Sequence, residues 1–329
     1  MRTTPERLQE ILDDAVARGE EHACQLAVYL DGRLFCDLAA GAADIHTRFP
    51  VFSAGKAPAI TAVLRLVERG VLELDAPVAR YWPEFGATGK ETITLRDILT
   101  HRAGMHILPP ATMAELADWD HMCALTAARR PVGTPGTRTR YQPITFAWLA
   151  GETAHRADGR DFKTIIRDEV LVRAGMEEFG YGIDPAAVGR TLGVHHPPEA
   201  AEDWHVRFIG DEHVKAGFIP SANAFSTARA LAKHYLAVMA GLLSPEMLQT
   251  ALTPPARGAD DPVRNWERFG LGYILWEGGA FGHGGALGSE GFGVPERRLA
   301  VGFTTDTFAP AHPVRDRISA ELDLPVRRW

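Results

Sequence analysis

Residues 52–70, FSAGKAPAITAVLRLVERG, decide the fold that we expect for this chain. Ser53 stands three positions before Lys56, and the apolar residues that follow are spaced as in an amphipathic helix ending at Gly70. Residues three apart share a helix face, so the Lys56 amine is expected to reach the Ser53 hydroxyl. An adjacent amine turns a serine into a nucleophile by taking its proton. The alternative is that Ser53 only caps the helix and Lys56 is solvated.

Strand patterns occupy both ends of the chain. Near the N-terminus, Asp31-Gly32 between two apolar segments predicts a tight hairpin, because a type I′ turn needs positive φ at both central positions. Glycine-punctuated apolar segments near the C-terminus predict further strands, joined in part by a turn at residues 295–298. The predicted strands are residues 25–30, 33–38, 270–276, 288–294 and 299–305, with helices at residues 5–18 and after Pro313.

The middle of the chain has helical patterns instead. Thr94 and Asp97 form a capping-box pattern before a short helix, and Ser226 is the predicted cap of a helix through Met239. Residues 144–157 and 162–173 are predicted helices, whereas residues 105–140 are expected to be irregular.

The expected fold is therefore α+β: an antiparallel β-sheet with strands from both chain ends, flanked by helices and interrupted by an all-helical insertion. We expect one subdomain to contain residues 1–75 and 216–329, and the other to contain residues 76–215, with the active site in the cleft between them.

Composition excludes several classes of protein. The 329 residues are 46% hydrophobic and 23% charged, which is ordinary for a globular protein. A net charge of -7 gives no reason to expect nucleic acid or an anionic membrane as a partner. The first ten residues are polar, no apolar run approaches a membrane span, and the three cysteines have no paired spacing. These features predict a cytoplasmic protein with free thiols.

The stretch from residue 52 to residue 104 resembles the block around the catalytic serine in the serine β-lactamase-like superfamily, which includes class C β-lactamases, DD-peptidases and family VIII esterases. The shared motifs are Ser-x-x-Lys, a "Leu-Asp-x-Pro-Val" turn at residues 74–78 and "Leu-Thr-His-x-x-Gly" at residues 99–104. Similarity continues through Tyr141 and the glycine-rich residues 282–288, so it covers most of the chain. The pattern is nearest to that of the family VIII esterases.

This resemblance implies a role for Tyr141 as proton-handling partner of Ser53 and Lys56. The matching triplet is Tyr141-Gln142-Pro143, where relatives usually have Tyr-x-Asn. In lactam-cleaving relatives the Asn contacts the acylamino group of the substrate, and Pro143 has no such donor or acceptor. β-Lactam and peptide turnover are therefore disfavoured, whereas ester hydrolysis needs no amide recognition.

The family's third motif, usually Lys-Thr-Gly, corresponds here to His283-Gly284-Gly285. Histidine supplies a titratable imidazole in place of a fixed charge, and the two glycines let substrate lie close to the strand. The resemblance implies an oxyanion hole made by the backbone N–H groups of Ser53 and Ala286. Gln142 and Phe218 are further candidates for substrate contact. The aromatic residues considered for the acyl pocket are His106, Trp119, Phe218, Tyr273 and Trp276.

The expected function is that of a serine esterase with a Ser53 acyl-enzyme, in which His283 assists catalysis. An acyltransferase using the same residues is the first alternative, followed by β-lactamase or peptidase activity and by a catalytically silent binding protein. No cofactor is implied, and without His-Glu-x-x-His or clustered Cys and His residues no metal site is expected. The expected partner is a small-molecule ester or acyl donor.

Overall fold

The computed structural model describes residues 3–255 and 268–325. Within these ranges, seven strands form one antiparallel sheet in the order β2-β1-β10-β9-β8-β7-β6, and three short strands form a second sheet in the order β3-β5-β4. The strands are β1 (Ala23–Leu30), β2 (Arg33–Gly41), β3 (Phe49–Pro50), β4 (Phe179–Tyr181), β5 (Ala224–Ser226), β6 (Arg268–Phe269), β7 (Ile274–Leu275), β8 (Phe281–Gly284), β9 (Glu290–Val294) and β10 (Leu299–Thr305).

The two chain ends meet at the pairing of β1 with β10, which aligns Cys24 with Thr305 and Leu30 with Leu299. The N-terminal hairpin has the predicted turn, since Asp31 and Gly32 have φ values of 52° and 80°. The expected α+β fold with strands from both chain ends is therefore confirmed.

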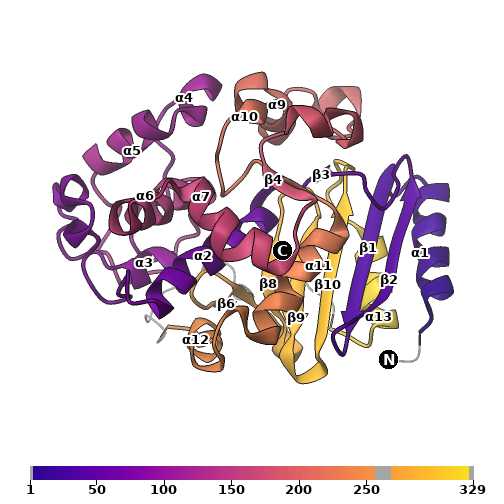
Figure 1. The fold of residues 1–329 in the computed structure, drawn as a ribbon. Coiled ribbons are helices and arrows are strands. Elements are labelled where there is room, and N and C mark those ends of the chain that lie inside the picture. The colour runs from indigo at the N-terminus through magenta and orange to yellow at the C-terminus, as the bar shows by residue number, and fades with distance from the viewer. Residues whose placement is uncertain (1–2, 256–267, 326–329) are drawn as a thin grey trace.

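Helices cover both faces of the large sheet, as Figure 1 shows. On one face α11 packs on β1, β9 and β10, and on the other α1 and α13 cover a separate apolar cluster. Most remaining helices lie in the part of the chain between β3 and β5. The helices are α1 (Pro5–Ala17), α2 (Lys56–Glu68), α3 (Leu95–Leu99), α4 (Met113–Ala117), α5 (Trp119–Ala128), α6 (Phe146–Asp158), α7 (Phe162–Ile166), α8 (Val172–Ala174), α9 (Trp204–Gly210), α10 (Glu212–Ala216), α11 (Ala228–Ala237), α12 (Pro245–Ala251) and α13 (Pro313–Glu321).

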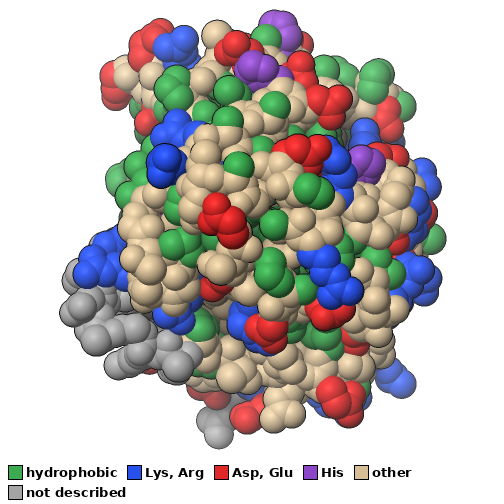
Figure 2. Space-filling model, turned by 90° about the vertical axis from the view of Figure 1, so that its left-hand side faces the viewer, with side chains coloured by type: hydrophobic (Ala, Val, Ile, Leu, Met, Phe, Trp, Pro, Cys, Tyr) green, Lys and Arg blue, Asp and Glu red, His purple; other side chains and the backbone are tan. Residues whose placement is uncertain are grey.

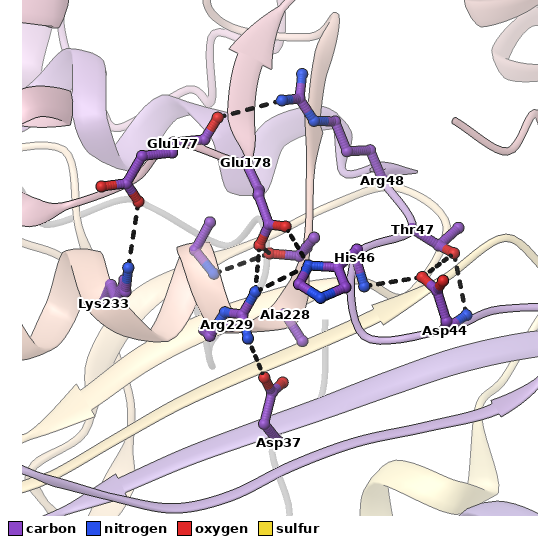
Figure 3. Close-up of polar contacts among 12 residues, drawn as sticks. Asp37, Asp44, His46, Thr47, Arg48, Glu177, Glu178, Ala228, Arg229 and Lys233 are labelled. Carbon is purple, nitrogen blue, oxygen red and sulfur yellow. Dashed lines mark hydrogen bonds and ion pairs between the residues drawn. The ribbon is translucent and has the colours of Figure 1, made fainter. Parts of the chain in front are cut away.

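A polar network holds the small sheet against α11, close to where the chain enters the Ser53 segment (Figure 3). Arg229 donates to Asp37 Oδ2 at 2.6 Å and to Glu178 Oε2 at 2.7 Å. His46 Nδ1 lies 2.6 Å from the other oxygen of Glu178. Arg48, one residue before β3, donates to the Glu177 carbonyl at 3.1 Å. The segment that leads to Ser53 is thus held by contacts from β2, from α11 and from the two residues that precede β4.

Two predictions about the helices were wrong. Residues 105–140 contain α4 and α5, and each begins with a side-chain cap, from Thr112 and Asp118 respectively. The prediction gave weight to the Pro and Gly residues and overlooked these caps. Ser226 ends β5 instead of capping α11, because Thr227 Oγ1 accepts the Ala230 N–H at 3.1 Å and serves as the cap.

Charged side chains of both signs are interspersed on the face that Figure 2 shows. No helix among the described residues is long and apolar enough to cross a membrane. Cys24, Cys36 and Cys123 are all buried free thiols, as their spacing predicted.

Candidate active site

Ser53 and Lys56 are in contact at the start of α2. Ser53 lies in a 3₁₀ turn, Phe52–Gly55, that runs directly into the helix. In a 3₁₀ turn residues three apart are eclipsed, which brings the two side chains together. Lys56 Nζ lies 2.8 Å from Ser53 Oγ and donates to the Ser221 carbonyl at 2.6 Å. The reach predicted from the spacing is therefore present in the structure.

Local packing explains why this turn is tight. Phe52 has φ 45°, a left-handed conformation that bulky residues rarely adopt and that is concentrated at functional sites. Gly55 lies against Ala224 of β5, where an added Cβ would come within 2.2 Å of the Ala224 side chain. Tyr181 of β4 donates to the Gly55 carbonyl at 2.7 Å. Strands β4 and β5 of the small sheet thus hold the turn that carries Ser53 in place.

The environment of Lys56 favours the neutral amine. Its side chain has no exposed surface, and burial lowers the pKa of the ammonium well below its usual range. A lysine whose pKa is lowered in this way holds a free lone pair at lower pH than an ordinary surface lysine does, so it can act as a base.

Tyr141 lies next to this pair. Lys56 Nζ is 5.1 Å from the centre of the Tyr141 ring. Phe269 stacks on the ring with centroids 5.6 Å apart, and His101 meets it edge-on at 5.0 Å. The His283 ring is tilted against the same ring, with centroids 6.0 Å apart. The structure therefore brings together Ser53, Lys56, Tyr141 and His283, the four candidate catalytic residues.

Gln142, a candidate for substrate contact, is not among the residues that line the pocket. Its side chain is fully buried, and its Oε1 lies 3.3 Å from His101 Nδ1. Burial lowers the pKa of His101 to about 3, so this imidazole is neutral. Gln142 thus packs behind Tyr141 and lies outside the pocket wall, which corrects the sequence prediction.

His283 lies on β8 and is also buried. Its Nδ1 is 2.8 Å from the Gly284 carbonyl and must donate to it, so Nε2 carries the lone pair. Burial lowers the pKa of His283 well below its usual range. Gly285 packs so closely on the segment before Ser53 that an added Cβ would lie 2.3 Å from the Val51 carbonyl oxygen. At Gly285, the lack of a side chain lets the strand pack closely against the backbone of Val51.

A pocket of about 750 Å³ opens in front of these groups. Ser53, Tyr141, His283, Gly284, Gly285 and Ala286 all line it. Pro143, which replaces the Asn of the second motif, lines it as well. The other walls come from residues without a local sequence signal for this role, namely Phe52, Ile144, Trp204, His205, Ala222, Phe269, Ile274, Gly288, Arg315, Asp316 and the segment 309–313.

Phe218 is placed elsewhere, which corrects the prediction that it contacts substrate. It packs in an aromatic cluster with Trp119 at 5.5 Å, Tyr181 at 5.4 Å and Phe162 at 6.3 Å. The other aromatic candidates, His106, Trp119, Tyr273 and Trp276, are likewise absent from the pocket wall. Aromatic residues are more often core than ligand contacts, and sequence gives no way to separate the two.

Comparison with known proteins agrees with this geometry. A family model described as Beta-lactamase matches residues 8–324. The chain is 34% identical to the esterase/beta-lactamase LipL of Mycobacterium tuberculosis, over 84% of this chain and 75% of LipL. It is 36% identical to the esterase EstB of Burkholderia gladioli, over 82% of this chain and 78% of EstB. Its fold is similar to that of a family VIII carboxylesterase, with a TM-score of 0.87, 26% identity and 96% of each chain covered.

These matches span nearly the whole chain, including the sheet, the helical part and every residue of the Ser53 site. The chain therefore belongs to the beta-lactamase family and is an enzyme of the serine hydrolase class.

Proposed function

We propose that this enzyme hydrolyses carboxylic esters through an acyl-enzyme on Ser53. One observation carries the proposal: a fully buried lysine amine lies 2.8 Å from the hydroxyl of a serine that lines a large pocket. A buried amine of lowered pKa is the base that a serine nucleophile requires.

The proposed reaction has two halves. Ser53 Oγ attacks the ester carbonyl while its proton passes to Lys56, and the carbonyl oxygen becomes an oxyanion that accepts the N–H groups of Ser53 and Ala286. The C–O bond to the alcohol breaks as Tyr141 supplies the leaving oxygen with a proton, which Lys56 restores. Water then attacks the acyl-enzyme while Tyr141 passes its own proton to the neutral Lys56 amine and accepts one from the water, with help from His283 Nε2, so that Lys56 holds the proton that Ser53 takes back. Ser53 leaves with a proton, and the carboxylic acid is released.

Two features of the pocket favour esters over lactams and peptides. Pro143 lines the pocket where relatives have an amide side chain, and it offers no polar side-chain atom. His283 is neutral, so it supplies no fixed positive charge at the third motif. The pocket therefore lacks two groups that lactams and peptides would need: an amide side chain for their acylamino group and a fixed positive charge for their carboxylate.

We also propose that residues 1–75 with 216–329 form one subdomain and residues 76–215 the other, with catalysis in the cleft between them. In support, the pocket takes Ser53 and His283 from the first and Tyr141, Pro143 and Trp204 from the second.

The test is hydrolysis of a short-chain p-nitrophenyl ester by Ser53→Ala, with Ser226→Ala as the matched control. Ser226 is also a buried serine, but its hydroxyl donates to the Thr227 carbonyl outside the pocket. We expect Ser53→Ala to lose at least about 1,000-fold in kcat/KM and Ser226→Ala to stay within a few-fold of wild type. Full activity in Ser53→Ala would refute the proposal.

The alternatives separate by product. Acyl transfer uses the same acyl-enzyme but gives a new ester when an alcohol is added, so hydrolysis product alone rules out obligatory transfer. Nitrocefin turnover at a rate comparable to that of the ester would instead favour lactamase activity. Absence of labelling by a fluorophosphonate probe would point to a silent binding protein.

A further inference from the structure

A second buried ionisable pair, Glu21 with His312, borders the active-site pocket and is unused by the proposed reaction. His312 Nδ1 lies 2.8 Å from Glu21 Oε1, and the two side chains are 5% and 0% exposed. A carboxylate bonded to one ring nitrogen fixes the tautomer and orientation of an imidazole. Here the ring forms part of the pocket wall, and its Nε2 has no hydrogen-bond partner in residues 3–255 and 268–325.

The His312 ring rests on the loop 285–289, which joins β8 to β9. At Gly288, φ is 96°, and an added Cβ would lie 2.3 Å from both Cδ2 and Nε2 of His312. Any side chain at this position would therefore collide with the ring. The tight contact means that the position of the ring and the position of the loop depend on each other.

Glu21 reaches the same loop by a second route. The Thr305 hydroxyl donates to the free carboxylate oxygen of Glu21. The Thr305 N–H in turn donates to Ser289 Oγ at 3.2 Å, and Ser289 is the last residue of the loop. Both oxygens of one buried carboxylate are thus tied to groups that hold this loop.

The loop carries the Ala286 N–H. It is closed by hydrogen bonds from Gly285 N to the Ser289 carbonyl at 2.7 Å and from Gly288 N to the Gly285 carbonyl at 3.1 Å. On its inner side, Gly285 packs on Val51, two residues before Ser53. The loop is therefore fixed between the nucleophile turn and the Glu21–His312 pair.

We propose that Glu21 and His312 are positioning residues that hold the loop 285–289 so that the Ala286 N–H points at the developing oxyanion. This inference rests on the proposed function, because it assumes that Ala286 contributes to the oxyanion hole. Small displacements of a donor matter in such a site, since the stabilisation depends on preorganised geometry.

The experiment compares His312→Ala, Glu21→Gln and the double variant with a matched control, His22→Ala. His22 Nδ1 also lies 2.8 Å from a buried carboxylate, that of Asp306, but His22 does not line the pocket. The measurements are kcat and KM for a p-nitrophenyl ester, the inhibition constant of an aryl boronic acid, and the melting temperature. The boronate forms a tetrahedral adduct with a serine nucleophile and places an oxygen in the oxyanion hole.

We expect His312→Ala to lower kcat by about 10- to 100-fold with KM within about 2-fold, and to weaken the boronate by a similar factor. Glu21→Gln, which keeps the size of the side chain, should shift both quantities in the same direction by less. The double variant should be no worse than His312→Ala, because the two residues act as a unit. His22→Ala should leave kcat and the boronate constant within about 2-fold, whatever its melting temperature.

The proposal is overturned if the His312 and Glu21 variants melt lower but keep the wild-type kcat and boronate affinity, because the pair would then be only structural. If His312→Ala does not fold, Glu21→Gln decides by the same criteria. A failure of the proposed function would be seen separately, because Ser53→Ala would then retain the ester activity of the wild type. In that case the inference about the loop would be wrong as well.

Discussion

Two of the five lysines, Lys56 and Lys90, have no exposed surface, yet their surroundings differ. Lys90 donates to the carbonyls of Ala87 and Ala127, each at 2.9 Å, to that of Arg129 at 2.5 Å, and to Thr88 Oγ1 at 2.6 Å. Among the described residues, the hydrogen-bond partners of Lys56 Nζ are two, the Ser221 carbonyl and the Ser53 hydroxyl.

The contrast teaches what makes a buried lysine a base. Burial lowers the pKa of both amines, but for Lys56 it does so to well below the usual range. Four oxygen atoms around Lys90 replace the hydration of an ammonium and join two segments of the helical part, residues 87–90 and residues 127–129. Around Lys56 the ammonium is poorly solvated, so the group can give up its proton and take that of Ser53.

The largest expected difference is in catalysis. Lys56→Met should lower kcat/KM for a p-nitrophenyl ester by about 1,000-fold or more, because the base is lost. Lys90→Met should stay within about 2-fold, since Lys90 is outside the pocket. Steady-state kinetics on both variants tests this, and comparable losses in the two would remove the distinction.

Stability should change in opposite directions. Lys90→Met removes a donor from four buried oxygen atoms, of which the Arg129 carbonyl keeps the Thr88 hydroxyl, and should lower the free energy of unfolding by about 2–4 kcal/mol. Lys56→Met removes a poorly solvated amine and should raise it by about 1 kcal/mol, as is common at catalytic positions. Urea denaturation at one neutral pH compares them. A large destabilisation by Lys56→Met would show that this amine is structural as well.

The stability difference at Lys56 should depend on pH. Between the lowered folded pKa and the ordinary value of 10.5, the unfolded chain holds one more proton at Lys56 than the folded protein does. The free energy of unfolding of the wild type therefore rises with pH relative to that of Lys56→Met, by at most about 1.4 kcal/mol per pH unit. Denaturation curves from about pH 8 to about pH 10 should show the advantage of Lys56→Met shrinking; an advantage that stays constant would argue against the lowered pKa.

The smallest effect concerns one acceptor of Lys90. Thr88→Val keeps the shape of the side chain but removes its hydroxyl, and should cost about 1 kcal/mol of unfolding free energy with no change in kcat/KM. Thermal denaturation with parallel ester assays measures both. A change in activity would mean that the Lys90 cluster communicates with the pocket.

Local sequence signals predicted the fold and the centre of the site. The Asp31-Gly32 turn and the contact of Ser53 with Lys56 join residues a few positions apart. Such contacts can be predicted from the helical repeat and from the backbone preferences of turn residues. The roles of Tyr141 and His283 came from family resemblance, and their ring contact in the structure joins residues far apart in sequence.

The pocket walls could not be predicted in the same way. Trp204, Phe269 and His312 reach the site only through tertiary packing of separate elements, so no spacing along the chain marks them. The predictions for Phe218 and Gln142 were wrong for a related reason: the family pattern places both near the site, but Gln142 is buried and the half-buried Phe218 packs in an aromatic cluster against the core. The subdomain boundaries at residues 75 and 215 stay a prediction.

Rate-resolved labelling with a fluorophosphonate probe, followed by peptide mapping, tests the central claim most directly, namely that Lys56 activates Ser53. The account predicts a single label on Ser53, formed at the wild-type rate in Lys90→Met and at least about 100-fold more slowly in Lys56→Met. A label on another residue, or equal labelling rates in the two lysine variants, would contradict it.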